Sequence, residues 1–160
     1  LLNSLKQEKK NLNTKVPIAI KISPDIEDSF IDKISNLLIK YNISAAIISN
    51  TTDKNRENLK NINKLEKGGL SGKPLEMKSN FLINKFYKIL KDKVKIIGVG
   101  GVDSGKSAYE KIINGASLVQ LYTGMIYKGP NIAFKISNEL IDILKNKGIK
   151  NISEVIGTKN

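Results

Sequence analysis

The chain has 160 residues, 40% of them hydrophobic, which suits one globular domain with a buried core. It contains no cysteine and no histidine. Disulfides, thiolate metal sites and histidine acid–base catalysis are therefore excluded, and we expect no metal centre. The formal net charge of +12 would ordinarily suggest a nucleic acid as partner. However, all basic residues except Arg56 are lysines scattered over predicted helix faces and loops, so we expect no nucleic-acid binding.

Residues 1–12 are predicted to be helical, and residues 16–23 are predicted to form the first strand. From residue 18 onward, three isoleucines alternate with Ala19, Lys21 and Ser23. In a barrel of parallel strands the narrow interior suits the small residues, so Lys21 would project into the mouth where ligands bind. The alternative is a lysine of an edge strand that lies in solvent.

The second predicted strand, Ala45–Ser49, follows a helix that we expect to open at Pro24 and Asp25. The apolar stripe of that helix is predicted to be Phe30, Ile34, Leu37 and Leu38. The strand runs directly into Asn50, Thr51 and Thr52, whose small polar groups stand where α/β proteins bind ligands. A plain polar turn is the alternative. Residues 53–67 are polar without periodicity and are predicted to be a surface loop or a mobile lid.

The segment GGLSGKPL, residues 68–75, contains three glycines ahead of Pro74. Such a sequence indicates a backbone that bends to approach another group closely. The helix predicted after it carries its apolar residues on one face, namely Leu82, Phe86, Ile89 and Leu90. That helix leads into the third predicted strand.

The third strand opens the segment VKIIGVGGVDSGKS, residues 94–107, which predicts a strand, a turn at Gly100 and Gly101, and a helix capped by Asp103 or Ser104. Gly100 to Ser107 matches the P-loop pattern G-x-x-x-x-G-K-S. A nucleoside-triphosphate site, however, also needs a strand that ends in a carboxylate for magnesium, and the one strand that follows, in SLVQLYTG, lacks it. The P-loop is therefore the weaker interpretation.

A (β/α) barrel offers a second interpretation of the same glycines. In such barrels the loops after the last two strands commonly hold a phosphate group. Here the penultimate strand ends at Gly100 and Gly101, and the last strand, Leu118–Tyr122, ends at Thr123 and Gly124. The remaining alternative is that these glycines only make tight turns.

Two further helices complete the pattern. The first continues to Gly115 with Ala108, Ile112 and Ile113 on its apolar face, and the last follows Gly129 and Pro130 and closes at Gly148. The sequence therefore predicts four βα units, which is half of an eightfold barrel.

Five segments in this order resemble the carboxyl-terminal half of the quinone-linked class of dihydroorotate dehydrogenase: VPIAIKISPD, IISNTT, GGLSGKPL, IIGVGGVDSG and GASLVQLYTG. GGLSGKPL is the most specific of them. The resemblance implies an α/β fold of the (β/α)8 TIM-barrel type, with residues 1–160 as its last four βα units. It also implies an FMN flavoprotein of pyrimidine biosynthesis, which oxidises dihydroorotate to orotate and passes the electrons to quinone. The expected location is peripheral, on the cytoplasmic side of a bacterial inner membrane.

The resemblance also implies roles for individual residues. Lys21 would lie beside the flavin ring, and the remaining cofactor-binding positions would be Ser49, Gly72, Gly100, Gly101, Tyr122 and Thr123, the last two at the phosphate. Asn50 and Thr51 would bind dihydroorotate or orotate. The catalytic base, a serine in this class, and the helices that meet the membrane and quinone are expected in an amino-terminal half outside this chain. The chain alone is therefore expected to be inactive, either as a half-enzyme that needs a partner chain or as a non-catalytic remnant.

Overall fold

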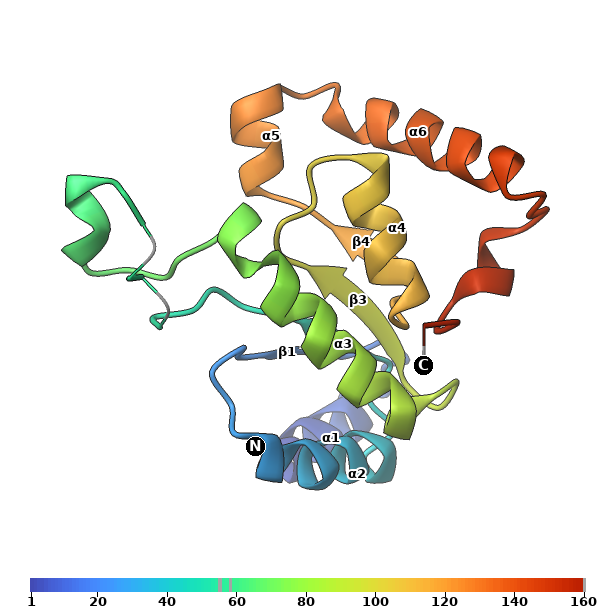
Figure 1. Cartoon of the computed structure of the whole chain (residues 1–160). Coiled ribbons are helices and arrows are strands. Elements are labelled where there is room, and N and C mark those ends of the chain that lie inside the picture. Colours follow the sequence, from blue (N-terminus) through green and yellow to red (C-terminus); the bar gives the residue numbers. More distant parts are fainter. Residues whose placement is uncertain (55, 58, 160) are drawn as a thin grey trace.

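The structure is a computed structural model that describes residues 1–54, 56–57 and 59–159. Within these residues, four strands form one parallel sheet in the order β1-β2-β3-β4 (Figure 1). The strands are β1 (Ala19–Ile22), β2 (Ala45–Ile48), β3 (Lys95–Val99) and β4 (Leu118–Gln120). Each strand lies within its predicted range, so the predicted βα pattern and the α/β fold are confirmed.

One α-helix connects each pair of consecutive strands, and further helices precede β1 and follow β4 (Figure 1). They are α1 (Leu2–Asn11), α2 (Ile31–Lys40), α3 (Glu76–Leu90), α4 (Gly105–Ile113), α5 (Thr123–Lys128) and α6 (Ile132–Asn146). Short 3₁₀ turns, η1 to η4, lie at Asp28–Phe30, Ile62–Leu65, Lys73–Leu75 and Ile152–Val155. None of the helices in the described ranges is long and apolar enough to span a bilayer.

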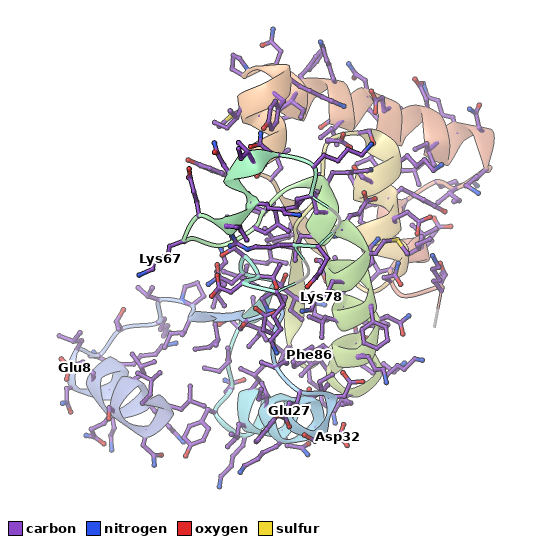
Figure 2. The ribbon with its side chains drawn as sticks, turned by 60° about the vertical axis from the view of Figure 1, so that its left-hand side comes forward. Glu8, Glu27, Asp32, Lys67, Lys78 and Phe86 are labelled. Atoms are coloured by element: carbon purple, nitrogen blue, oxygen red, sulfur yellow. The ribbon has the colours of Figure 1, made fainter. Side chains whose placement is uncertain are left out.

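The core lies on one face of the sheet, because alternate strand residues point to opposite faces. Ile48 and Ile96 are buried on this face against α2 and α3, together with Phe86 of α3 (Figure 2). A second apolar cluster joins α4 to α6 around Ala108 and Ile132. The hydrophobic free energy gained by burying these side chains is the main contribution that stabilises the helices on the sheet.

The opposite face of the sheet carries one row of residues in register across all four strands. This row consists of Lys21, Ile47, Ile97 and Leu118. Lys21 is exposed, and Leu118 is 61% exposed. In a closed barrel this face is the interior.

The helix predicted to open at Pro24 starts later than expected. The chain first makes the turn η1, and α2 begins at Ile31. Phe30 therefore precedes the helix and is 47% exposed, whereas Ile31 is buried and takes the predicted place of Phe30 in the core.

The polar segment 53–67 is a loop, as predicted, with η2 as its regular turn. Residues 55 and 58 of this predicted loop lie outside the described residues. The guanidinium of Arg56 donates hydrogen bonds to the carbonyl groups of Lys64, Glu66 and Gly68. The single arginine of the chain therefore folds the second half of the loop back onto its first half.

Helix α4 buries a charged group. Lys111 is fully buried, and its Nζ donates a hydrogen bond to Asn80 Oδ1 at 2.7 Å. Burial is the main reason why the pKa of Lys111 is lowered to about 8. The charge of Glu76 raises this pKa, and the charge of Lys73 lowers it further. A cation in this position costs free energy because it has left water.

We expect Lys111→Met to stabilise the protein at neutral pH. The folded pKa of about 8 lies below the ordinary 10.5, so the folded state holds fewer protons between these values and wild-type stability should rise with pH there. At pH 7 the free energy of unfolding of the variant should exceed that of the wild type by about 1–3 kcal/mol. The variant should not show the increase of stability with pH. Urea unfolding at pH 7 and pH 9.5, with the exposed Lys106→Met as control, measures both effects. A destabilised variant with the wild-type pH profile would contradict the assignment.

Candidate active site

A cavity of about 750 Å³ lies at the carboxyl ends of the strands. All nine residues singled out from the sequence line it: Lys21, Ser49, Asn50, Thr51, Gly72, Gly100, Gly101, Tyr122 and Thr123. They come from β1 and from the segments that follow β2, β3 and β4. The structure therefore brings the predicted residues together, while their individual roles remain predictions.

The turn after β2 forms one wall of the cavity. Ser49 is buried and donates a hydrogen bond from Oγ to the carbonyl oxygen of Asn50 at 3.0 Å. The Asn50 side chain accepts a hydrogen bond from the Thr51 backbone N–H at 2.9 Å. Local hydrogen bonds of this kind fix a turn without secondary structure. Lys21 approaches the same wall from β1.

Asp25 holds this wall to its neighbours, a role that the sequence did not indicate. Its carboxylate accepts hydrogen bonds from Thr52 Oγ1 at 2.6 Å, from Lys78 Nζ at 2.6 Å and from the Asp53 N–H at 3.1 Å. Burial raises the pKa of Asp25, but the bonds from Lys78, Thr52 and Asp53 outweigh burial and lower the pKa below 3.8. Asp25 thus joins the segment after β1 to the turn after β2 and to α3.

The glycine-rich segment between β2 and α3 packs on the turn after β4. The hydroxyl groups of Ser71 and Thr123 are hydrogen bonded at 2.9 Å. Gly72 has a φ of +76°, and a Cβ there would lie 2.9 Å from Thr123 Cγ2. Glycine is therefore required at this position by both conformation and space.

The turn at Gly100 and Gly101 serves the fold as well as the cavity. Both residues have positive φ, and a Cβ on Gly101 would lie 2.4 Å from the Cβ of Glu76. Gly101 thus lets α3 start close to the turn, and both glycines also line the cavity. A bulky residue at Gly101 would disturb this packing before it met any ligand.

The amino terminus of α4 is occupied by groups of the chain itself. Ser104 is the N-cap, as one of the two sequence interpretations expected, and its Oγ accepts a hydrogen bond from the Ser107 N–H at 3.2 Å. The Glu139 carboxylate of α6 accepts the Gly105 N–H. The Ser107 hydroxyl is bonded to Ser104 and Asp103, and Lys106 is exposed. The N–H groups of Gly105 and Ser107 therefore have partners within the chain, and the P-loop match finds no support.

The charges around the cavity favour an anionic ligand. Lys21, Lys73 and Lys128 line it together with Asp103, whose carboxylate lies 3.2 Å from the Lys128 Nζ. Three cations against one carboxylate give the lining a positive balance. Such a balance attracts phosphate or carboxylate groups.

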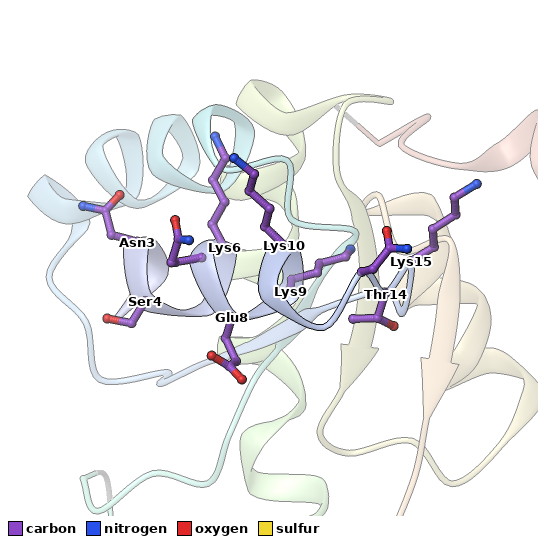
Figure 3. Close-up of a pocket in the computed structure, with 10 residues that line it drawn as sticks. Asn3, Ser4, Lys6, Glu8, Lys9, Lys10, Thr14 and Lys15 are labelled. Atoms are coloured by element: carbon purple, nitrogen blue, oxygen red, sulfur yellow. The ribbon is translucent and has the colours of Figure 1, made fainter.

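A second hollow, of about 1060 Å³, runs along α1 (Figure 3). Its ten lining residues all lie between Asn3 and Lys15, and they are lysines, one glutamate and small polar residues. This hollow is the polar surface of one helix and the turn after it, and it contains no residue singled out from the sequence. We therefore place the candidate site in the cavity at the strand ends.

The parallel sheet, the helices on one of its faces and the cavity at the carboxyl ends of the strands define part of a (β/α)8 barrel. Comparison with known proteins gives the family. The family model described as dihydroorotate dehydrogenase matches residues 1–144. The chain therefore belongs to the dihydroorotate dehydrogenase family.

Several relatives named dihydroorotate dehydrogenase (quinone) are similar over most of the chain. The protein of Buchnera aphidicola subsp. Schizaphis graminum is 47% identical over 144 residues, 88% of this chain and 43% of the relative. The protein of Nautilia profundicola is 43% identical over 159 residues, 99% of this chain and 43% of the relative. The chain thus spans less than half the length of these relatives.

A solved structure gives the same result for the fold. The crystal structure of dihydroorotate dehydrogenase from Eimeria tenella in complex with ferulenol superposes with a TM-score of 0.86 at 38% sequence identity. The match covers 89% of this chain and 38% of the Eimeria chain. The partial barrel seen here is therefore part of a larger fold in that protein.

We expect Asp25→Asn to destabilise the protein by about 1–2 kcal/mol at pH 7, because the charge-assisted bond from Lys78 is weakened. Since the folded pKa of Asp25 is lowered below 3.8, its contribution is present above that value and is lost as pH falls through the folded pKa. Urea unfolding at pH 7 and near pH 3 measures the difference between wild type and variant, which should shrink in acid.

Asp28→Asn is the matched control, because the 3.6 Å ion pair of Asp28 with Lys85 is more exposed and should contribute little. Equal losses in the two variants would contradict the role given to Asp25.

Proposed function

We propose that this chain supplies the last four βα units, the carboxyl-terminal half, of an FMN-dependent, quinone-linked dihydroorotate dehydrogenase. The observation that carries the proposal is the convergence of all nine predicted residues on one cavity. Membership of the family and the names of the relatives agree with it. The reaction proposed for the whole protein is oxidation of dihydroorotate to orotate with quinone as electron acceptor.

The residues present fit FMN. The cavity volume of about 750 Å³ is in the range of cofactor pockets. The turn at Gly100 and Gly101 lines the cavity together with the turn at Tyr122 and Thr123, where the short helix α5 begins. In many (β/α) barrels the loops after the last two strands hold a phosphate group. The positive lining suits the phosphate charge. When bound, FMN would take up two electrons from dihydroorotate and pass them to quinone.

Lys21 is proposed to lie beside the flavin ring, at the opposite wall from the phosphate turn. Its ammonium group would favour negative charge on the reduced ring. Ser49 and Gly72 are proposed to contact the flavin between these two ends, and the Asn50 and Thr51 side chains to hydrogen bond the pyrimidine ring of dihydroorotate or orotate. Their location in the turn after β2, beside Lys21, supports this assignment.

The bare face of the sheet supports the proposal that the rest of a barrel packs here. The row from Lys21 to Leu118 becomes interior only when further strands close the barrel. We propose that an amino-terminal half, on the same or a separate chain, provides these strands and the catalytic serine. Contact with quinone and with the cytoplasmic side of the membrane is also assigned to that half. By this account residues 1–160 alone do not turn over substrate.

We expect Lys21→Met to impair flavin reduction more than flavin retention. The test uses this chain co-expressed with the amino-terminal half of the Buchnera relative. The variant should keep FMN through gel filtration but reduce it with dihydroorotate about 10²-fold more slowly in single-turnover absorbance measurements, because one electrostatic contact to the developing negative charge is lost. Lys95→Met, on the same sheet face at the other end of the barrel, is the control and should behave as wild type.

Normal reduction by Lys21→Met would contradict the proposed position of Lys21. A complex that holds no FMN would contradict the proposed function itself.

A further inference from the structure

Two residues of the charged cavity lining, Asp103 and Lys128, have no individual role in the function proposed above. Asp103 follows the turn at Gly101, and its Oδ2 lies 3.2 Å from Nζ of Lys128. The same Nζ donates a hydrogen bond to the backbone carbonyl of Asp103 at 2.8 Å. Lys73 approaches the other carboxylate oxygen of Asp103 at 3.9 Å but is bound more closely by Glu76. Lys128 is therefore the principal partner of Asp103.

Helix α5 contacts the segment that carries Asp103 at both of its ends. The helix has six residues, all of them described, and none of them is buried. A helix of this length is unstable on its own. At its start, a Cβ on Gly124 would lie 2.5 Å from the carbonyl oxygen of Val102, so the helix backbone rests on the segment that carries Asp103. At its end, Lys128 reaches back to Asp103. Both ends of α5 are thus attached to residues 102–103.

The location of α5 determines the position of Thr123. Thr123 is the first residue of the helix, and its hydroxyl is hydrogen bonded to Ser71 of the glycine-rich segment. A displacement of α5 would therefore move the turn at Tyr122 and Thr123 relative to the turn at Gly100 and Gly101. The space between these two turns is where the phosphate is proposed to bind.

We propose that Asp103 and Lys128 are positioning residues, whose ion pair holds α5 on the β3–α4 loop and so sets the width of the phosphate site between the two turns. This inference rests on the proposed function, because it takes FMN as the ligand. It assigns neither side chain a direct contact with the phosphate.

The electrostatics agree with a stable pair. Burial raises the pKa of Asp103, but the hydrogen bond and charge of Lys128, followed by the charge of Lys73, outweigh it and lower the pKa below its ordinary value. Asp103 is therefore a carboxylate throughout the neutral range. Lys128 also stands at the carboxyl end of α5, where a cation is favoured by the helix dipole.

Direct attraction of the phosphate by Lys128 is the competing explanation, and the two differ in the effect of Asp103→Asn. If Lys128 acted by its charge on the ligand, removal of the opposing carboxylate would tighten FMN binding. If the pair positions α5, the same substitution weakens FMN binding. Because riboflavin lacks the phosphate, the positioning role predicts that neither substitution changes the affinity for riboflavin.

The experiment measures dissociation constants for FMN and riboflavin by flavin fluorescence, in the co-expressed complex described above. Asp103→Asn and Lys128→Met should each raise the constant for FMN by about three- to tenfold, the effect expected for one charge-assisted contact. The constant for riboflavin should not change, and Lys128→Arg should restore FMN binding. Lys159→Met removes a 2.8 Å ion pair with Glu110 outside the cavity and is the matched control.

A second measurement needs no ligand. Hydrogen exchange of this chain without flavin should be faster in residues 123–128 of both variants and unchanged in α6. Unchanged exchange in α5, or tighter FMN binding by Asp103→Asn, would overturn the inference. If wild type binds no flavin but α5 loosens in both variants, the proposed function fails while the hold of the pair on α5 stands.

Discussion

Parallel pairing in register is the constraint on which the candidate site depends. It aligns Lys21, Ile47, Ile97 and Leu118 in one row, so that the segments following the strands emerge at the same edge of the sheet. Burial of the alternate residues against α2 and α3 then determines which face the helices cover. Once Ile22 and Ile48 are in the core, Lys21 must point to the other face. Hydrophobic burial on the helix-covered face of the sheet therefore orients the one lysine that is proposed to meet the flavin ring.

The cavity itself is held together by polar contacts between segments that have little regular structure. Asp25 joins the first wall to α3, the Ser71 and Thr123 hydroxyl groups join the glycine-rich segment to the last turn, and Lys128 joins α5 to the β3–α4 loop. Each contact links two elements that the sheet has already brought close. The sheet gives the approximate geometry of the site, and these contacts connect the segments that line it.

The strands and the nine cavity residues could be predicted because they depend on local patterns, such as alternating isoleucines and glycines at strand ends. The role of Asp25 could not be predicted, since its partners Thr52 and Lys78 lie 27 and 53 residues away and no local pattern shows them. Helix α5 was missed because six residues are too few to display a periodicity. The close packing of Gly101 against Glu76 could not be predicted either, because this contact exists only in the folded chain.

The central claim, that the two turns after β3 and β4 form a phosphate site, is tested most directly by nuclear magnetic resonance of the isotopically labelled chain, in complex with an unlabelled amino-terminal half. Addition of FMN should shift the backbone amide signals of Gly100, Gly101, Tyr122 and Thr123. Riboflavin should leave these signals largely in place, since it lacks the phosphate. Gly148, at the end of α6, should not respond to either ligand. Shifts confined to α1, or equal shifts with both ligands at the two turns, would contradict the account.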